Sequence, residues 1–376
     1  MEQVMGVINL GNEFDRLNEL TYFRCPASVP FGGRYRMIDF TLSNMVNSGI
    51  RDAAVLTLHK YRSLMDHLGT GKEWDLARKR GGLFILPPAF DVTSGVYKGD
   101  LQNFLAHLDF FRRGSQKYVL IAGSQIICNI DYCQPFLFHQ NVGADITVLY
   151  KKIDPGAAGY EHCKRLEIGE GGRITAMETA DGMTDSGKAD ISNVFMDMFL
   201  IEKSLLVDII QTCVSQGKYD FLKDGISNYL NKLGVYGYEY QGYMAPVYSV
   251  QDYYRNSMNL LDPGIWNELF LRRRLIYTKV KDEPPVEYLE GARVENSLVA
   301  NGCVIEGEVE NSILFRGVKV RKGARIKNSI ILQHCDIEPN ARIEHAIMDK
   351  DASLTGGRML AGTLDHPLVV AKRMVV

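Results

Sequence analysis

The sequence predicts an α/β protein in which a mostly parallel sheet covered by helices is followed by a parallel β-helix. Two observations predict it. Short apolar runs alternate with helical patterns up to residue 261, and aliphatic residues recur every six positions after residue 290. The 376 residues, 46% of them hydrophobic, suffice for one large and one smaller core. We therefore expect domains at 1–261 and 290–376, joined by a linker at 262–289.

The apolar runs of the first domain are continuous rather than alternating. "MGVINL", "DAAVLTL", "YVLIAG" and "DITVLYK" are typical of strands buried on both faces. Between the first two, Ile38, Leu42, Met45 and Val46 recur at helical spacing, and Gly49 follows where a left-handed C-cap belongs. "LQNFLAHLDFFRR" also has a helical pattern. This order predicts a parallel sheet with crossover helices.

The composition changes near residue 262, in "DPGIWNELFLRRRLIYTKVKDEPPVEYLEGA". Its Glu-Pro-Pro step ends regular structure because proline lacks an N–H group. Arg272, Arg273 and Arg274 either bind an anionic effector or belong to a solvated linker.

The second domain repeats with a period of six. The repeating positions are Leu298 and Val304, then Leu314, Val320, Ile326 and Leu332, then Ile337 and Ile343 after a slip of one. This period is typical of a parallel β-helix, in which each coil packs on its neighbours. The flat faces and open end coils of such a solenoid commonly serve in assembly.

Composition excludes several function classes. A net charge of −2 provides no global field toward nucleic acid or an anionic membrane. The amino terminus lacks a signal-peptide pattern, and no stretch approaches the roughly 20 apolar residues of a membrane span. We therefore expect a cytoplasmic protein with neither nucleic acid nor membrane as partner. The seven scattered cysteines predict reduced thiols rather than a disulfide framework.

Two long stretches resemble one enzyme family. "VPFGGRYRMIDFTLSNMVNSGIRDAAVLT", residues 29–57, resembles the amino-terminal motif of the glucose-1-phosphate adenylyltransferases, or ADP-glucose pyrophosphorylases. "NSLVANGCVIEGEVENSILFRGVKV", residues 296–320, resembles their carboxy-terminal β-helix. The resemblance implies a Rossmann-like nucleotidyltransferase domain, a left-handed β-helix, a tetramer and glycogen or starch-like glucan synthesis. That family joins ATP and glucose 1-phosphate into ADP-glucose and pyrophosphate with Mg²⁺.

The phosphate loop departs from the family pattern Gly-Gly-x-Gly-x-Arg-Leu. In "LGNEFDRL", Gly11, Arg16 and Leu17 remain, whereas Glu13 and Asp15 are carboxylates that would face phosphate oxygens. Like charges about 5 Å apart repel by roughly 3 kcal/mol at an effective dielectric of about 20. Alternatively, both carboxylates turn to solvent and leave the backbone usable.

Other positions that the resemblance marks as functional are also replaced. Cys25 in "FRCPAS" stands for the family lysine that meets the phosphates, and the neighbouring Arg24 could partly compensate. Ser124 and Pro246 stand for the two aspartates that hold the metal. Asp197 stands for a family glycine near the phosphate path.

On the sugar side, the family's Glu-Lys-Pro clamp is absent from "RITAMETADGMTDSGK", whose first lysine is Lys188. Asp220 and Lys223 in "YDFLKD" resemble a family sugar-binding motif. They are read either as its remnant or as helix-capping and surface residues.

Joint loss of functional positions within a retained framework indicates a regulatory subunit that is non-catalytic or weakly catalytic. By resemblance, its partner is a catalytic glucose-1-phosphate adenylyltransferase subunit in a hetero-oligomer, expected to be a heterotetramer. No bound cofactor is expected, and Mg²⁺ is used by the catalytic partner. The alternative is an active enzyme with a rearranged metal site, for which Asp131 is the nearest carboxylate after Ser124.

Effector binding is a compatible reading. Arg34, Arg36 and Arg51 align with basic positions near the activator site of bacterial relatives, so they either bind a phosphorylated metabolite or are solvated on a helix surface. A β-helix acyltransferase using His334 or His345 is a further alternative, although no acyltransferase pattern surrounds them.

Overall fold

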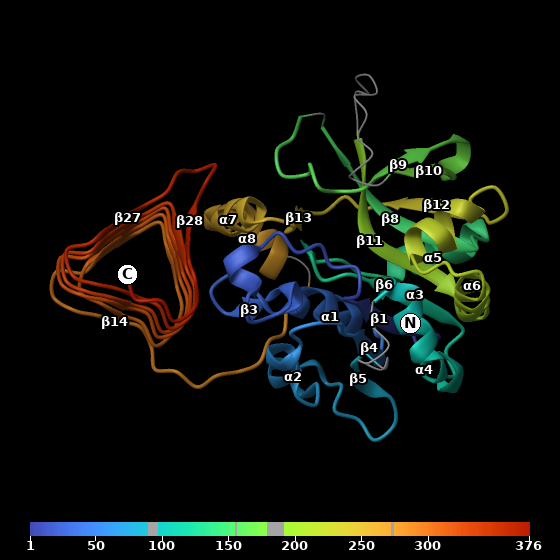
Figure 1. Ribbon diagram of the computed structural model, residues 1–376, viewed down its shortest axis with the longest axis horizontal. Helices are drawn as coiled ribbons and strands as arrows, with labels where there is room; N and C mark the ends of the chain where they lie inside the picture. The colour runs from blue at the N-terminus through green and yellow to red at the C-terminus, as the bar shows by residue number, and fades with distance from the viewer. Residues whose placement is uncertain (89–96, 155, 179–191, 272–273) are drawn as a thin grey trace.

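The computed structural model describes residues 1–88, 97–154, 156–178, 192–271 and 274–376. Figure 1 shows a sheet-containing domain beside a stack of β-helix coils, with helices α7 and α8 between them. Lys188, Arg272 and Arg273 lie outside the described residues, so the interpretations of them stay predictions. Among the helices that the structure describes, none has the length and apolar character needed to span a bilayer.

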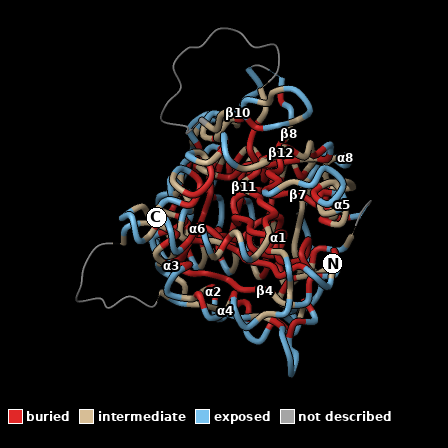
Figure 2. The backbone as a smooth tube through the Cα atoms, turned by 90° about the vertical axis from the view of Figure 1, so that its right-hand side faces the viewer, coloured by how far each residue is buried: buried red, intermediate tan, exposed pale blue. Residues whose placement is uncertain are grey.

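The main sheet is mixed, with the predicted parallel strands at its centre and antiparallel pairs at β11. Its order is β10-β9-β11-β6-β1-β4-β5, with β8 beside β11 and β12 beside β8. The part around β1 is parallel, whereas β11 runs antiparallel to β6 and β8. Figure 2 shows β4 and β11 in the buried centre. The strands are β1 (Val4–Asn9), β4 (Asp52–Leu56), β5 (Gly82–Leu86), β6 (Tyr118–Ala122), β8 (Ile146–Ile153), β9 (Arg165–Ile168), β10 (Ile174–Glu178), β11 (Ser192–Glu202) and β12 (Val235–Glu239).

The first domain also contains two short antiparallel pairs and a set of helices. The pairs are β2 (Pro30–Phe31) with β3 (Tyr35–Arg36), and β7 (Ile126–Cys128) with β13 (Met244–Pro246). The α-helices in the described part are α1 (Met37–Asn47), α2 (Arg62–Leu68), α3 (Asp100–Ala106), α4 (Leu108–Arg113), α5 (Cys133–Val142), α6 (Lys203–Ser215), α7 (Val250–Met258) and α8 (Pro263–Phe270).

The helical patterns were informative. Ile38, Leu42 and Met45 are buried on α1, and Gly49 just beyond it has a φ of 86°, the left-handed conformation that glycine adopts without strain. The pattern of residues 101–113 forms two helices, because His107 leaves helical geometry with φ −110° and ψ 24°.

The predicted linker is partly wrong. Residues 263–270 form α8, which begins with a proline at its first turn and is capped by Asp262. Leu269 and Phe270 are buried, so this helix belongs to the core of the molecule. The β-helix also begins before residue 290, with β14 (Glu287–Tyr288).

The second domain is a parallel β-helix with three sheets. The first sheet is β14, β17 (Val304–Ile305), β20 (Lys319–Val320), β23 (Asp336–Ile337) and β26 (Ser353–Leu354). The second is β15 (Arg293–Glu295), β18 (Glu308–Glu310), β21 (Arg325–Lys327), β24 (Arg342–Glu344) and β27 (Met359–Ala361). The third is β16 (Leu298–Val299), β19 (Ile313–Leu314), β22 (Ile330–Ile331), β25 (Ala346–Met348) and β28 (Leu368–Val370).

Most predicted core positions of the β-helix are confirmed, and three are wrong. Leu314, Val320, Ile326, Ile337 and Ile343 pack together inside the solenoid. Leu298, Val304 and Leu332 do not fill the equivalent inward positions, which belong to Val299, Ile305 and Ile331.

A tight corner explains the error. Between Ile326 and Ile331 the inward spacing shortens to five residues, and Asn328 in that step has a left-handed φ of 46°. Asn296 and Asn311 have left-handed φ values of 40° and 44° in the corresponding steps of earlier coils. A strict period of six therefore drifts out of phase once per coil.

The two domains share a core. Phe31, Phe40 and Phe270 pack in one cluster with Ile313 and Ile330, which point outward from the third β-helix sheet. At the edge of this contact, the buried Arg24 guanidinium donates hydrogen bonds to the buried Asp349 carboxylate. The domains are thus joined by apolar packing and by a buried ion pair.

Candidate functional site

The phosphate loop connects β1 to a short helix at Asn18–Thr21, beside the carboxyl ends of the parallel strands. Two of its central backbone N–H groups already have partners within the chain. Gly11 N donates to Asn9 Oδ1 at 3.0 Å, and Phe14 N donates to Gln125 Oε1 at 2.7 Å. A phosphate-binding loop offers such donors to the ligand. Here protein oxygens occupy them.

Glu13 occupies the strand end that faces the loop. The hydroxyl of Ser124 donates to Glu13 Oε1. Burial raises the pKa of Glu13 to about 8, and the neighbouring Asp15 and Asp197 add to the shift. The Glu13 carboxyl is therefore mainly protonated at neutral pH. It blocks the phosphate position chiefly by its hydrogen bond to Ser124, and charge repulsion contributes less.

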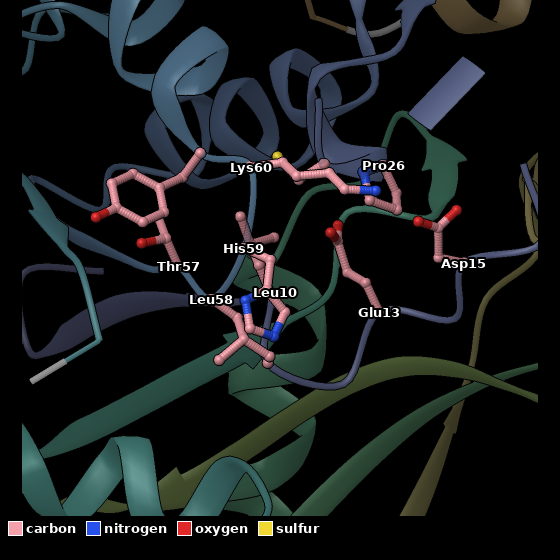
Figure 3. Close-up of a pocket in the computed structure, with 11 residues that line it drawn as sticks. Leu10, Glu13, Asp15, Pro26, Thr57, Leu58, His59 and Lys60 are labelled. Atoms are coloured by element: carbon pink, nitrogen blue, oxygen red, sulfur yellow. The ribbon is translucent and has the colours of Figure 1, made fainter. Parts of the chain in front are cut away.

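Asp15 is held by its own loop. Its Oδ1 accepts from Thr21 Oγ1 at 2.6 Å and from Leu17 N at 3.3 Å. Arg16 lies over the ring of Phe14, with its guanidinium carbon 4.6 Å from the ring centroid. Glu13 and Asp15 line a cavity of about 200 Å³, and Figure 3 shows their carboxyl groups on the Pro26 side of the loop.

Cys25 also lines this cavity and supplies no positive charge. It is buried, and burial raises the pKa of its thiol to about 12. The predicted compensation by Arg24 is wrong, because the Arg24 guanidinium is engaged with Asp349 of the β-helix. All seven cysteines are free thiols, as expected.

The two positions that stand for metal aspartates come close together. Pro246 pairs with Ile126, and Val247 N donates to the carbonyl of Gln125 at 2.8 Å, next to Ser124. A neutral hydroxyl and a proline are poor replacements for the carboxylates that Mg²⁺ prefers among protein ligands. Within the described residues, no three His, Cys, Asp or Glu side chains are grouped to hold a metal ion.

Asp131, the carboxylate named for a rearranged metal site, has both of its oxygens engaged within the chain. Its Oδ2 accepts from Arg274 Nη2 at 3.1 Å, and its Oδ1 accepts from Cys133 N at 3.0 Å. Both contacts hold Asp131 at the start of α5, and Arg274 is engaged there too.

Asp197 has a backbone conformation that favours glycine, the residue that the resemblance implies at this point. Its φ of 54° is left-handed, at a register shift in β11. Its carboxylate is buried against Gly123, where an added Cβ would lie 2.2 Å from Asp197 Oδ2. Burial raises the pKa of Asp197.

Asp100 is a site residue that the sequence analysis missed. Its Oδ2 accepts from Asn9 Nδ2 at 3.0 Å and Asn12 Nδ2 at 2.6 Å, and its Oδ1 accepts from Phe221 N at 2.8 Å. Burial raises the pKa of Asp100 to about 7. Tyr97 donates its hydroxyl to the carbonyl of Gly11 at 3.1 Å. An aspartate at a helix start resembles an ordinary cap, so only the fold reveals that Asp100 fastens the loop.

Asp220 and Lys223 lie at the start of a π-helix, Phe221–Ile226. Asp220 Oδ1 accepts from Lys223 N at 2.8 Å, and both residues are exposed. The capping role left open by the sequence accounts for this contact. Their sugar-binding role stays a prediction.

A second cavity, of about 240 Å³, lies where β3 and the linker face the β-helix. It is strongly basic. Its charged lining residues are Arg34, Arg36, Lys279, Lys281, Arg316, Lys350, Lys372 and a single carboxylate, Asp351. The fold thus brings Arg34 and Arg36 together with cations from distant segments. Arg51 is absent from this lining and lies 3.8 Å from Glu2 at the start of β4.

Comparisons with known proteins place the chain in one family. Residues 6–160 match the nucleotidyl transferase family model, and residues 286–363 match a GlmU-like C-terminal hexapeptide model. The glycogen biosynthesis protein GlgD of Bacillus subtilis is 40% identical over 99% of this chain and 97% of that protein. The chain belongs to the GlgD-like glycogen biosynthesis proteins within the glucose-1-phosphate adenylyltransferase family.

A pair of proteins from Geobacillus stearothermophilus sharpens the assignment. Its GlgD is 42% identical over 86% of this chain and 82% of that protein. Its glucose-1-phosphate adenylyltransferase is 32% identical over 86% of this chain and 83% of that protein. This GlgD homologue is therefore nearer to GlgD than to the adenylyltransferase of the same organism.

Proposed function

We propose that this chain is a regulatory subunit of glucose-1-phosphate adenylyltransferase, non-catalytic or weakly catalytic by itself, which acts in glycogen biosynthesis through a catalytic partner. The reaction of that partner joins ATP and glucose 1-phosphate into ADP-glucose and pyrophosphate. The observation that carries the proposal is the closure of the phosphate loop by Asn9, Gln125 and Glu13.

The chemistry at the strand ends supports the same conclusion. Nucleotidyl transfer depends on cations that neutralise charge developing on phosphate. Cys25, Ser124 and Pro246 provide neither a cation nor a carboxylate ligand for a metal. Mg²⁺ then belongs to the catalytic partner, and the retained sheet domain and β-helix serve assembly into a hetero-oligomer, which we propose to be a heterotetramer.

The basic cavity supports a second part of the proposal, binding of a phosphorylated effector. Arg34 and Arg36 face cations of the linker and the β-helix across it. Such a cluster suits a phosphate group, which accepts several charge-assisted hydrogen bonds. Because both domains line the cavity, an effector there would bias how the domains meet and hence how the partner is held.

The test uses the full chain and a catalytic glucose-1-phosphate adenylyltransferase of the same organism, alone and co-expressed. We expect the chain alone to form ADP-glucose at least about 1,000-fold more slowly than the catalytic subunit, since removal of a major electrostatic group costs about 10²–10³ in rate. The mixture should elute as one larger complex and show altered kinetics.

Two outcomes would contradict the proposal. Rapid ADP-glucose synthesis by the chain alone would indicate an active enzyme. Separate elution of the two proteins, with kinetics equal to those of the catalytic subunit, would remove the regulatory role. Titration of inorganic phosphate on the Arg34→Ala variant separates effector binding from assembly.

A further inference from the structure

Lys350 lies in the basic cavity among cations from three other segments. Its lining includes Arg36 at the end of β3, Lys281 of the linker and Arg316 of the β-helix. Burial lowers the pKa of Lys350 to about 7, and Arg36, Arg24 and Lys281 lower it further, whereas Asp349 opposes the shift. A sizeable fraction of Lys350 is therefore the free amine at neutral pH.

The side chain of Lys350 also lacks a partner. Its backbone is engaged, since the N–H donates to Asp349 Oδ1 at 2.7 Å and the carbonyl accepts from Arg373 N at 3.0 Å. Its ammonium nitrogen makes no hydrogen bond or ion pair with any residue of the described ranges. Two further groups of the lining, Arg316 Nε and Gln333 Oε1, are buried without hydrogen-bond partners. The cavity thus contains the side-chain amine of Lys350 and the Arg316 guanidinium, a cationic donor with a hydrogen bond still to make.

We propose that Lys350 is a carbamylation site, whose side-chain amine reversibly binds carbon dioxide among the cations of the basic cavity. The amine lone pair attacks the carbon of CO₂, and an N–C bond forms. One C=O π pair moves to oxygen, and one N–H proton leaves to water. The product is an N-carboxylysine anion, and loss of CO₂ with return of the proton reverses the step.

The surroundings favour this product on electrostatic grounds. Carbamylation converts a group that is repelled by Arg36, Arg24 and Lys281 into an anion that they attract. The same cations would hold a phosphate ion, and a bound phosphate stabilises the ammonium form of Lys350. Carbamate formation and phosphate binding should therefore compete.

The full chain is incubated with ¹³C-labelled bicarbonate near neutral pH and followed by ¹³C NMR. We expect a carbamate resonance that is lost in Lys350→Arg, which keeps the positive charge. Lys279→Arg and Lys372→Arg are matched controls in the same cavity and should retain the resonance. Because an α-amino group also forms carbamates, trapping with a trialkyloxonium salt and peptide mass analysis locates the modified residue.

Inorganic phosphate supplies an independent readout. Its addition should reduce the Lys350 carbamate in the unaltered chain, and Arg34→Ala should weaken this effect. Trapped label on other lysines only would overturn the proposal, whereas a Lys350 carbamate that phosphate leaves unchanged would contradict the proposed binding of phosphate in this cavity. The trapping experiment on the unaltered chain decides the question even if Lys350→Arg does not fold. These results do not depend on a catalytic partner, so they stand apart from the test of the regulatory function.

Discussion

The cavity at the phosphate loop and the basic cavity between the domains treat anions in opposite ways. In the first, Gly11 N and Phe14 N donate to protein oxygens, and Glu13 covers Ser124. In the second, seven lysine and arginine side chains line the cavity with one carboxylate. The chain has thus closed the anion site that its family uses for transfer, while a different cationic cavity stays open. That contrast supports a role in regulation rather than chemistry.

The largest expected effect comes from Arg24, whose neighbour Cys25 lines the first cavity and whose partner Asp349 adjoins Lys350 of the second. Arg24→Ala leaves the Asp349 carboxylate buried without its partner, and such a loss destabilises by about 3–5 kcal/mol. Urea unfolding of the full chain measures the effect. The double variant Arg24→Met with Asp349→Leu should recover much of it, because well-packed apolar residues can replace a buried ion pair. Equal losses in the single and double variants would contradict this account.

The second prediction concerns phosphate in the basic cavity. Arg34→Ala should weaken the binding of inorganic phosphate about tenfold, since a charge-assisted hydrogen bond contributes about 1.5 kcal/mol or more. Arg51→Ala is the matched control, because Arg51 is exposed beside Glu2. Calorimetric titration measures both. Equal weakening by the two substitutions would mean that phosphate is attracted by overall charge and not by this cavity.

The third prediction uses the pKa of Glu13. Because the folded pKa of about 8 exceeds the usual 4.5, the folded chain holds a proton that the unfolded chain releases, so stability falls as the pH rises toward 8. Asp100, with a pKa of about 7, lowers stability in the same way as the pH rises, but mainly below pH 7. Between about pH 7 and pH 8, Glu13→Gln should therefore flatten a slope of at most about 1.4 kcal/mol per unit. Urea unfolding at both pH values measures it, and an unchanged slope would show that Glu13 is ionised.

The smallest effect is expected at Asp15. Asp15→Asn retains an oxygen for Thr21 and should alter stability by no more than about 0.5 kcal/mol. It should also leave the melting temperature insensitive to ATP, because the occupied loop donors remain. Binding of ATP by this variant alone would show that charge, and not the hydrogen bonding of the loop, keeps the first cavity closed.

Much of the molecule was predictable from local pattern. The helical spacing of Ile38, Leu42 and Met45 was confirmed on α1, and the β-helix was confirmed from its period. The errors lie where non-local packing decides. Residues 263–270 were predicted as linker but form α8. Their local sequence does not decide between helix and loop, and the burial of Leu269 and Phe270 stabilises the helix. Leu332 was misplaced because a tight corner shortens the repeat.

The sequence by itself determined which chemical groups the family site lacks, because a cysteine, a serine and a proline at positions 25, 124 and 246 cannot supply a cation or metal carboxylates in any fold. Only the tertiary structure decided what replaced them. Glu13 meets Ser124 from 111 residues away, and Arg24 meets Asp349 from 325 residues away. The tertiary structure also places Arg34 and Lys350 in the basic cavity and leaves Arg51 outside that cavity, beside Glu2. Such contacts depend on how strands and coils pack in three dimensions. A local sequence pattern covers only neighbouring residues, so it does not indicate which distant residues meet.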